Sequence, residues 1–171
     1  MKIRPETLSD CPAITEVNNL AFGQPNKGKL VENLRKNPKF IPELSLVAEI
    51  DWKIAGHILF FPVVIKLENS EEKEIMSLAP VAVLPEFQRQ GIEGELIREG
   101  LKACQRLGYD SVIFLGHPEY YPKFGFKPAN KWRITDPFGV PNEAFMALEL
   151  KVEALEGAGG VVEYPGEFLE V

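Results

Sequence analysis

The spacing of hydrophobic residues changes from helical to strand-like after about residue 40. Before that point, apolar residues three and four apart predict one helix capped by Ser9 or Asp10 and ended by Gly23, and a second helix over about 27–36. A short first strand is expected at residues 2–4. The predicted core positions of the first helix are Ile14, Val17, Leu20 and Ala21. Three strands are predicted next, as an antiparallel meander, at LSLVAEI, KIAGHILFFPVVIKL and EIMSLAPVAVL.

The most regular helical pattern covers residues 91–107, and Gly108 supplies its end. The continuous apolar run SVIFLG, 111–116, predicts a central strand parallel to the strand before this helix, so the three form a βαβ unit. A short helix near 118–124, a loop over about 128–142 and the strands AFMALEL and GVVEY follow. The apolar half of helix 91–107 consists of Ile92, Leu96, Ile97, Leu101, Ala103, Cys104 and Leu107.

Composition and charge restrict the class of protein. The 171 residues, 45% of them hydrophobic, predict one domain over 1–171. A formal charge of −6 argues against general nucleic-acid binding. Cys11 and Cys104 lack the spacing of metal ligands and are expected to be reduced structural thiols. Neither a membrane-spanning apolar run nor a secretory signal is evident, so a cytoplasmic protein with no membrane partner is expected.

The turn between Val83 and Ile92 has the chemistry of an anion site. The first N–H groups of a helix have no backbone acceptors, and the helix dipole adds positive potential there. Gly91 allows close backbone approach, and Arg89 adds a positive charge. The spacing excludes a P-loop and a dinucleotide-binding glycine motif. Ordinary turn chemistry explains the same residues, and both explanations stay open on these residues alone.

In combination, two segments resemble the GCN5-related N-acetyltransferases, the GNAT family. VAVLPEFQRQGI lies on the strand-to-helix turn, and YYPKFGF follows the next strand. The family signature is Gln or Arg, two residues, Gly, one residue, then Gly or Ala; Gln88 and Gly91 fit it, whereas Glu93 occupies the last position. LGHPEYYPKFGFKPA and FMALEL…GVVEYPGEF are similar to a bacterial and archaeal branch of predicted acetyltransferases.

The resemblance implies an α/β fold: a mixed, mostly antiparallel central sheet, splayed between its fourth and fifth strands and flanked by helices. Acetyl-CoA, the co-substrate, would lie in the opening, with its pantetheine arm on the fourth strand and its pyrophosphate on the turn. Pro80 agrees with a splay, because proline in a strand marks a bulge or an unpaired position. The implied cofactor-binding residues are Val81, Ala82, Val83, Gln88, Arg89, Gln90, Gly91, Ile92, Glu93 and Gly94.

Transfer of acetyl to an amine requires a neutral amine, a stabilised oxyanion and protonation of the leaving thiolate. By resemblance, Tyr121 stands where the family keeps the tyrosine that protonates the CoA sulfur. Aromatic packing is the alternative for Tyr121, and Tyr120 could exchange roles with it. The backbone N–H of Val83 could polarise the acetyl carbonyl.

Two histidines are candidates for the base, although an amine often loses its proton to water instead. His117 follows the central strand, at the edge of the sheet where ligands collect; capping of the short helix explains it slightly better. His57 lies within the strand IAGHILF, and a hydrogen-bonded core histidine is the favoured interpretation. No metal site is expected.

Two loops could select the acceptor, a small-molecule or protein amine. They are GQPNKGK after the first helix and NKWRITDPFGVPNE, which carries Trp132, Asp136, Phe138 and Glu143. Their residues permit a cationic amine, and a solvated loop with a packed Trp132 explains them equally well. The oligomeric state, monomer or homodimer, stays open.

The main alternative function is a catalytically weak or inactive acetyltransferase-like protein that binds CoA or a metabolite. Glu93 motivates it, because an acid in this turn repels a pyrophosphate. A KH-type nucleic-acid module is the other rival, since GIEGELI contains Gly-x-x-Gly. An acid in the clamp of a protein with charge −6 disfavours that interpretation.

Overall fold

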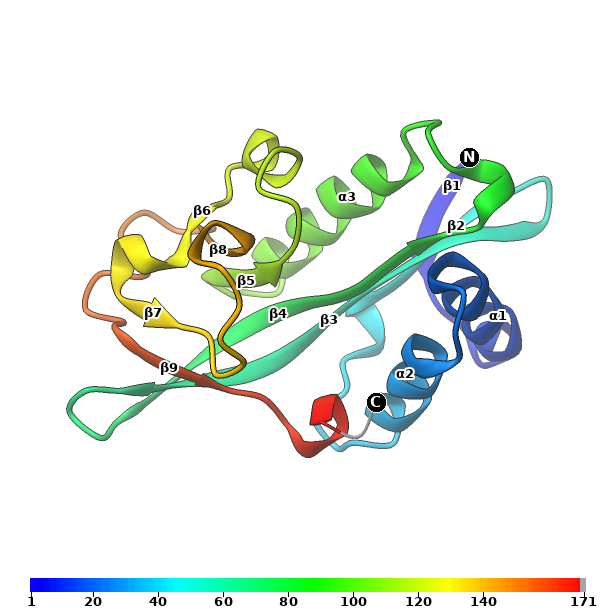
Figure 1. Cartoon of the computed structure of the whole chain (residues 1–171). Coiled ribbons are helices and arrows are strands. Elements are labelled where there is room, and N and C mark those ends of the chain that lie inside the picture. Colours follow the sequence, from blue (N-terminus) through cyan, green and yellow to red (C-terminus); the bar gives the residue numbers. More distant parts are fainter. Residues whose placement is uncertain (170–171) are drawn as a thin grey trace. The chain divides into compact units, whose positions relative to one another are not determined.

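The computed structural model describes residues 1–169, whose elements are shown in Figure 1. They group into two compact units, each built from separated parts of the chain. The long strands β3 (Lys53–Leu67) and β4 (Glu72–Val83) pass from one unit into the other. The first unit holds 1–61, 79–103 and the described residues from 166; the second holds 62–78 and 104–165. The expectation of a single domain over 1–171 stays a prediction.

The first unit contains an antiparallel set of strands. Strand β1 (Lys2–Pro5) pairs with β2 (Ser45–Ile50), and β2 pairs with β3, so that Ile3 lies opposite Ala48. The predicted strands at the N-terminus and over LSLVAEI are therefore confirmed. Helices α1 (Cys11–Phe22) and α2 (Asn26–Arg35) follow β1 along the chain. Short 3-10 helices lie at Leu8–Asp10, Pro42–Leu44 and Pro85–Phe87.

Both predicted N-terminal helices form, and they bury one face each. Helix α1 ends at Gly23, whose φ of 66° is left-handed. Its buried face is formed by Ile14, Val17 and Asn18, whereas Leu20 is 50% exposed. The prediction that Leu20 belongs to the core was wrong, because six residues after Ile14 a helix has turned to a different side. Around these helices the core of the first unit contains Ile14, Val17, Leu30, Val31, Leu34, Val47, Ile54, Leu59, Phe61, Ala82 and Leu84.

Helix α3 (Ile92–Arg106) packs closely on β3 at Gly56. A Cβ there would lie 3.0 Å from Leu96 Cδ1 and 3.2 Å from Ile92 Cγ2, closer than most Cβ contacts, so the glycine eases this approach. At the other end, Leu107 is 43% exposed, although the pattern placed it in the apolar half. The helix has already ended, because the Tyr109 N–H bonds back to the carbonyl of Cys104 at 3.0 Å.

The second unit contains the parallel pair that the sequence predicts. Strand β5 (Ser111–Leu115) runs parallel to β4, with Met76 opposite Val112. On its other side β5 pairs antiparallel with β8 (Phe145–Glu149), so the run 111–115 is central, as predicted. Strand β6 (Lys127–Pro128) extends this set beyond β8. The mixed sheet with a parallel β4–β5 pair is confirmed.

The region predicted as a loop over 128–142 is more ordered than expected. It contains the short strand β7 (Ile134–Thr135), which pairs in parallel with β9 (Gly160–Glu163). Strand β9, predicted at GVVEY, also pairs antiparallel with β3. The pairing could not be predicted, because two residues carry no periodicity. Further 3-10 helices lie at Tyr121–Phe124, Ala129–Trp132, Asn142–Ala144 and, in the first unit, Gly166–Leu169.

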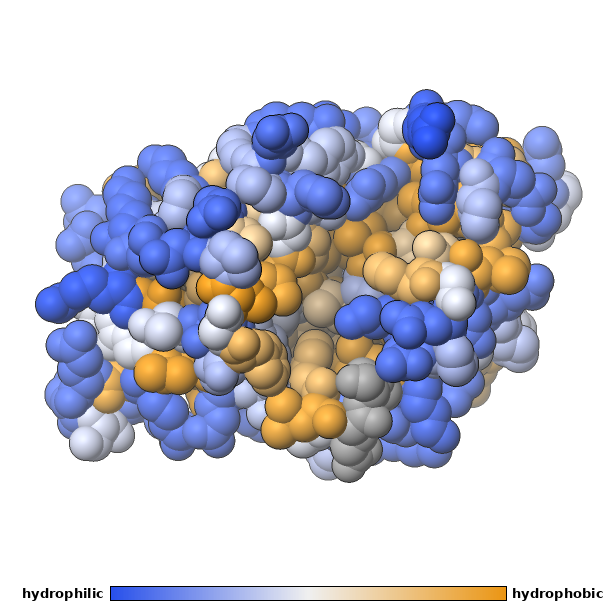
Figure 2. Space-filling view, in the orientation of Figure 1, coloured by the Kyte–Doolittle hydropathy of each residue, from blue (hydrophilic) through white to orange (hydrophobic). Residues whose placement is uncertain are grey.

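The turn that joins β3 to β4 is polar, as ENSEEK predicts. The Ser70 N–H donates to the carbonyl of Leu67 at 3.0 Å, and Ser70 has a φ of 74°. Hydrophilic residues cover this end of the second unit in the space-filling view (Figures 1 and 2). The turn is therefore an ordinary solvated hairpin.

Candidate functional site

The predicted anion turn lies in the first unit, between β4 and α3. After the 3-10 helix Pro85–Phe87, the Gln88 side-chain amide donates to the carbonyl of Val83 at 3.0 Å and closes the turn. Two residues then adopt left-handed backbone conformations, Arg89 with φ 64° and Gly91 with φ 85°. Such changes of backbone sign turn successive N–H groups toward one side, which is how peptide nests bind anions.

This turn is accessible. Arg89 and Gly91 are exposed, and no atom lies within 4 Å of the position that a Cβ on Gly91 would take. The first helical hydrogen bond runs from Glu95 N to the Gly91 carbonyl at 3.1 Å, so the amides before Glu95 precede the intrahelical ladder. The residues present therefore fit a pyrophosphate, whose oxygens accept from backbone N–H groups.

Glu93 lies in the first turn of α3 and is half-buried, between the buried residues Ile92 and Gly94. Glu95, two residues later, is exposed. That Glu93 does not belong to the solvated face of the helix stays a prediction, because Glu99, expected on that face, is half-buried as well. Its carboxylate opposes the binding of an anionic ligand at these amides.

The predicted pantetheine-binding segment is the last part of β4. Ala82 and Val83 are buried, at 3% and 8% exposure, and Val81 is half-buried. The Val83 carbonyl accepts from Gln88, so the strand end and the anion turn are linked directly. Any contact of this segment with CoA would involve the backbone, which every residue type provides.

Tyr121 lies in the second unit, at the start of the 3-10 helix Tyr121–Phe124, and is only 5% exposed. Its ring is edge-on to Phe114, with 4.1 Å between centroids, and lies 6.3 Å from the ring of Phe126. Gly116 makes room for it, because a Cβ there would lie 2.7 Å from Tyr121 Cε2. The ring position of Tyr121 is thus determined by three neighbours.

Tyr120 and His117 differ from Tyr121 in exposure. Tyr120 is half-buried, with the Lys123 ammonium 3.9 Å from its ring centroid, and His117 is exposed. The His117 carbonyl accepts the N–H groups of Tyr120 and Tyr121, at 3.2 and 3.4 Å. His117 therefore closes the turn through its backbone, and the role of its imidazole stays a prediction.

His57 is a core histidine, as favoured from the sequence. It is fully buried, and Asn18 Nδ2 lies 3.1 Å from its Nδ1. Asn18 donates there, so Nε2 carries the hydrogen and donates to Ser45 Oγ at 2.9 Å. Ser45 in turn hydrogen-bonds Glu6. Burial, and after it the positive charge of Arg35, lower the pKa of His57 to about 3.

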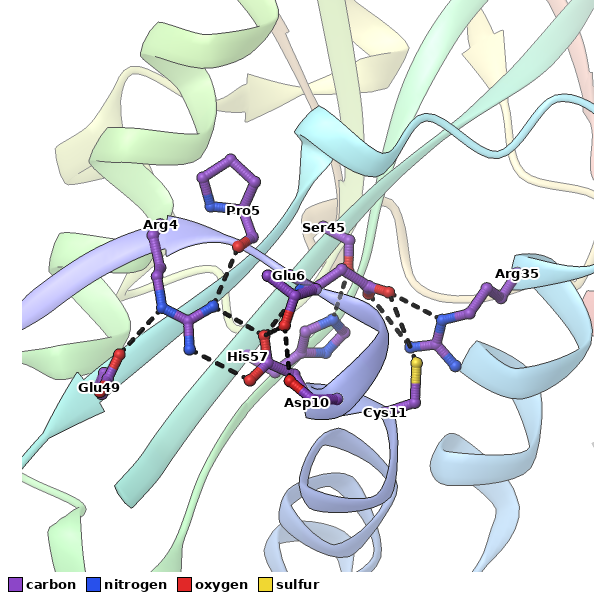
Figure 3. A network of polar contacts seen from close by, with 11 residues as sticks. Arg4, Pro5, Glu6, Asp10, Cys11, Arg35, Ser45, Glu49 and His57 are labelled. Carbon is purple, nitrogen blue, oxygen red and sulfur yellow. Dashed lines mark hydrogen bonds and ion pairs between the residues drawn. The ribbon is translucent and has the colours of Figure 1, made fainter. Parts of the chain in front are cut away.

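The same network contains the ion pairs of the first unit's interior (Figure 3). Arg35 Nε lies 2.9 Å from a Glu6 carboxylate oxygen. Arg4 pairs with Asp10 at 2.7 Å and with Glu49 at 2.9 Å, and the Arg4 hydrogen bond lowers the pKa of Asp10 to about 2. These groups are satisfied by one another, so the network is structural.

The two cysteines are free, as predicted. Burial raises the pKa of Cys104 to about 12 and raises that of Cys11 as well, so neither thiol is activated. Among the described residues, no group of three His, Cys, Asp or Glu side chains could hold a metal ion. Within residues 1–169 no helix is both long and apolar enough to cross a membrane.

The candidate acceptor loops have different structures. Most of GQPNKGK forms the first turn of α2, which begins at Asn26. The second loop borders a hollow, of which Asp136 is a lining residue. Trp132 packs against the core of the second unit, and Glu143 is exposed. Sequence reasoning named Asp136 but missed the hollow; the Asp-Pro-x-Gly turn was the only available signal.

The description "Acetyltransferase (GNAT) domain" belongs to a family model that matches residues 2–129. Among curated proteins, the uncharacterized N-acetyltransferase YjhQ of Escherichia coli K12 is 39% identical over 136 residues, 79% of this chain and 75% of YjhQ. The uncharacterized N-acetyltransferase YhbS of the same strain is 33% identical over 169 residues, 98% of each chain.

Solved structures agree with these relatives. The crystal structure of E. coli YhbS in complex with CoA superimposes with a TM-score of 0.90 at 31% identity, covering 98% of this chain and 91% of that one. A GNAT family acetyltransferase from Brucella melitensis, in complex with acetyl-CoA, gives 0.79 at 34% identity, covering 98% and 97%. The chain therefore belongs to the GNAT family of N-acetyltransferases, and its fold is that of the family.

Proposed function

We propose that the protein moves the acetyl group of acetyl-CoA directly to a primary amine. The observation that carries this proposal is the open left-handed turn before α3, where exposed Arg89 and Gly91 present backbone amides suited to a pyrophosphate. The YhbS and Brucella proteins were crystallised with CoA and acetyl-CoA, which supports the same ligand here. Acetyl-CoA would supply an acetyl group activated as a thioester.

Different residues of the chain would bind acetyl-CoA and catalyse the transfer. The amides of residues 89–94 would hold the pyrophosphate, and the backbone of Val81–Val83 would hold the pantetheine arm. The Val83 N–H would polarise the acetyl carbonyl. Tyr121 would donate its hydroxyl proton to the departing sulfur, and the contacts of its ring with Phe114 and Phe126 would orient it.

Removal of the proton from the acceptor is the less defined step. A primary amine has a pKa of about 10.4, so it must lose a proton before it attacks. His117 is exposed on the loop after β5 and is the proposed base, with water as the alternative. His57 is excluded from this role, because it is fully buried and both of its ring nitrogens are occupied.

The test is the release of free CoA thiol over a panel of primary amines, together with calorimetric titration of CoA. We expect CoA to bind and at least one amine to be acetylated. Failure to bind CoA at millimolar ligand contradicts the proposal. The proposal also includes the remaining expectations. The protein would be a monomer or homodimer in the cytoplasm, with no nucleic-acid or membrane partner and no metal.

One specific observation favours a second candidate function. Glu93 is half-buried in the first turn of α3, next to the amides that the pyrophosphate would use. A carboxylate there would weaken CoA binding and leave a catalytically weak or inactive CoA-binding or metabolite-binding protein. CoA binding without acetylation of any amine in the panel would favour this alternative.

A further inference from the structure

The segment that joins β4 to α3 contains the backbone amides proposed for the pyrophosphate, and it contacts the core through one side chain. It lies between the buried residues Leu84 and Ile92, and Figure 1 shows it in green. Every residue from Pro85 to Gly91 is exposed except Phe87, which is half-buried. Phe87 is therefore the residue that holds this segment against the first unit.

Two kinds of contact hold Phe87. Its ring packs against the apolar core cluster of the first unit, to which α1, α2, β3 and β4 contribute. Lys53, the first residue of β3, lies over the same ring, with its ammonium 5.8 Å from the ring centroid and 3.0 Å from Glu86 Oε1. Both side chains of this ion pair are more than half exposed, so the pair contributes little by itself. The apolar contact of Phe87 with the core is thus the main anchor of the segment.

The end of β4, just before this segment, is held by hydrogen bonds. The Leu84 N–H donates to the carbonyl of Ala55 in β3, and the Phe87 N–H donates to the carbonyl of Leu84, both at 2.8 Å. The Gln88 side chain adds its bond to the carbonyl of Val83 at 3.0 Å. Because Leu84 is attached directly to β3, the strand end keeps its place without the Phe87 ring.

The residues after Phe87 have no apolar side chain of their own. Residues 88–91, the anion turn, have the sequence Gln-Arg-Gln-Gly. Arg89 and Gly91 adopt left-handed conformations, so the direction of each amide depends on the path of the chain. The Phe87 ring anchors that path at one end and the buried Ile92 at the other. Amides that are already ordered bind an anion more tightly, because binding does not have to order them.

We propose that Phe87 is a positioning residue for acetyl-CoA: its contact with the core directs the amides of the anion turn toward the pyrophosphate. This inference rests on the proposed function. Phe87 itself does not touch acetyl-CoA and acts through residues 88–91. It should therefore govern the affinity for a donor that carries a pyrophosphate, without changing the transfer step or the binding of the pantetheine arm to Val81–Val83.

Kinetics with two acetyl donors separate these effects. S-acetylpantetheine has the same thioester as acetyl-CoA but lacks the pyrophosphate. Phe87→Ala should raise KM for acetyl-CoA at least about tenfold, with kcat nearly unchanged, because the turn must then be ordered on binding. Its kcat/KM for S-acetylpantetheine should equal that of the wild type, and Phe87→Leu, which keeps an apolar side chain, should restore most of the affinity for acetyl-CoA. An unchanged KM for acetyl-CoA, or an equal loss with both donors, would overturn the proposal.

Phe40 provides a matched control in the same unit. It is half-buried, packs against the same core cluster, and has the Arg35 guanidinium 5.9 Å from its ring centroid, compared with 5.8 Å between Lys53 and Phe87. Phe40→Ala should lower the unfolding temperature, as Phe87→Ala does, because each removes a ring from the same core. It should leave KM for acetyl-CoA unchanged. A rise of KM in both variants would show that lost stability, rather than lost position, is the cause.

Nuclear magnetic resonance relaxation tests the positioning without any ligand. The backbone amides of residues 89–91 should be rigid in the wild type and flexible in Phe87→Ala, with order parameters that fall below about 0.6. Phe40→Ala should keep the wild-type values. A turn that is flexible in the wild type, or rigid in Phe87→Ala, would overturn the proposal. If the wild type does not bind CoA, the proposed function fails, whereas these order parameters still decide whether Phe87 positions the turn.

Discussion

Gly116 and Tyr121 are in a contact that only a glycine permits: a Cβ on Gly116 would lie 2.7 Å from Cε2 of the tyrosine ring. Phe114 contacts the same ring from another side, with 4.1 Å between centroids. A general acid is most effective when neighbouring residues fix the orientation of its side chain. The contact thus connects the packing of the second unit with the chemistry proposed for Tyr121.

Replacement of Tyr121 by Phe removes the hydroxyl and keeps the packed ring. We expect turnover to fall ~10²–10⁴-fold with CoA affinity nearly unchanged, since a general acid acts chiefly in the transition state. Steady-state kinetics and CoA calorimetry measure the two quantities. Tyr120→Phe is the control and should keep most activity. An equal loss in both variants, or none in Tyr121→Phe, would assign the acid elsewhere.

Gly116→Ala should displace the Tyr121 ring. The added methyl group overlaps the rings of Tyr121 and Phe114, so we expect unfolding to require ~1–3 kcal/mol less free energy and turnover to drop. Gly166→Ala, where a Cβ meets no atom within 4 Å, is the matched control. If the loss of activity in Gly116→Ala is caused by displacement of Tyr121, the double variant Gly116→Ala, Tyr121→Phe should be only slightly less active than Tyr121→Phe alone. Full additivity would show a separate cause.

Glu93→Gly restores the family pattern, and we expect it to bind CoA more tightly than the wild type. The gain should shrink as salt screens the repulsion between the carboxylate and the pyrophosphate. CoA titrations at low and high ionic strength measure it, and Glu93→Gln separates charge from helix propensity. Glu95→Gln removes an exposed acid from the same helix turn and should change affinity less. Unchanged or weaker binding by Glu93→Gly would leave the helix dipole as the reason for this acid.

His57 should make the folded state sensitive to mild acid. Folded His57 has a pKa of about 3, whereas an unfolded histidine has a pKa of about 6.5. Between those values the unfolded chain binds more protons, so the free energy of unfolding falls as pH falls below 6.5, by roughly 3 kcal/mol at pH 4. Asp10 adds to this loss of stability only at lower pH, because its pKa is about 2 in the folded state and 3.8 in the unfolded chain.

Denaturant unfolding from pH 7 to pH 4 measures this dependence. His57→Gln retains groups that can bond Asn18 and Ser45 but cannot be protonated, so its stability should change less over this range. His117→Gln, at an exposed histidine, should follow the wild type. If the unfolding free energy of His57→Gln falls with pH as steeply as that of the wild type, another group causes the acid sensitivity.

The sequence alone was sufficient for the helices, the long strands and the parallel β4–β5 pair. Helix 92–106 repeats its apolar residues at a helical period, and the run 111–115 is apolar throughout, so burial of these segments determines their conformation locally. The turn from Gln88 to Gly91 was predictable for the same reason: glycine and the helix start act over a few residues. Family resemblance then added Tyr121, which no local pattern distinguishes from Tyr120.

Only the tertiary structure decided which side chains meet across long distances in the chain. Leu20 and Leu107 looked like core residues, yet the face of α1 and the end of α3 leave them exposed. The partners of His57 come from α1 and β2, and the room for Tyr121 comes from Gly116. Strand β7, next to Asp136, pairs with β9, a short segment more than twenty residues further along the chain. Periodicity reports which face is apolar, whereas packing between distant segments decides what that face touches.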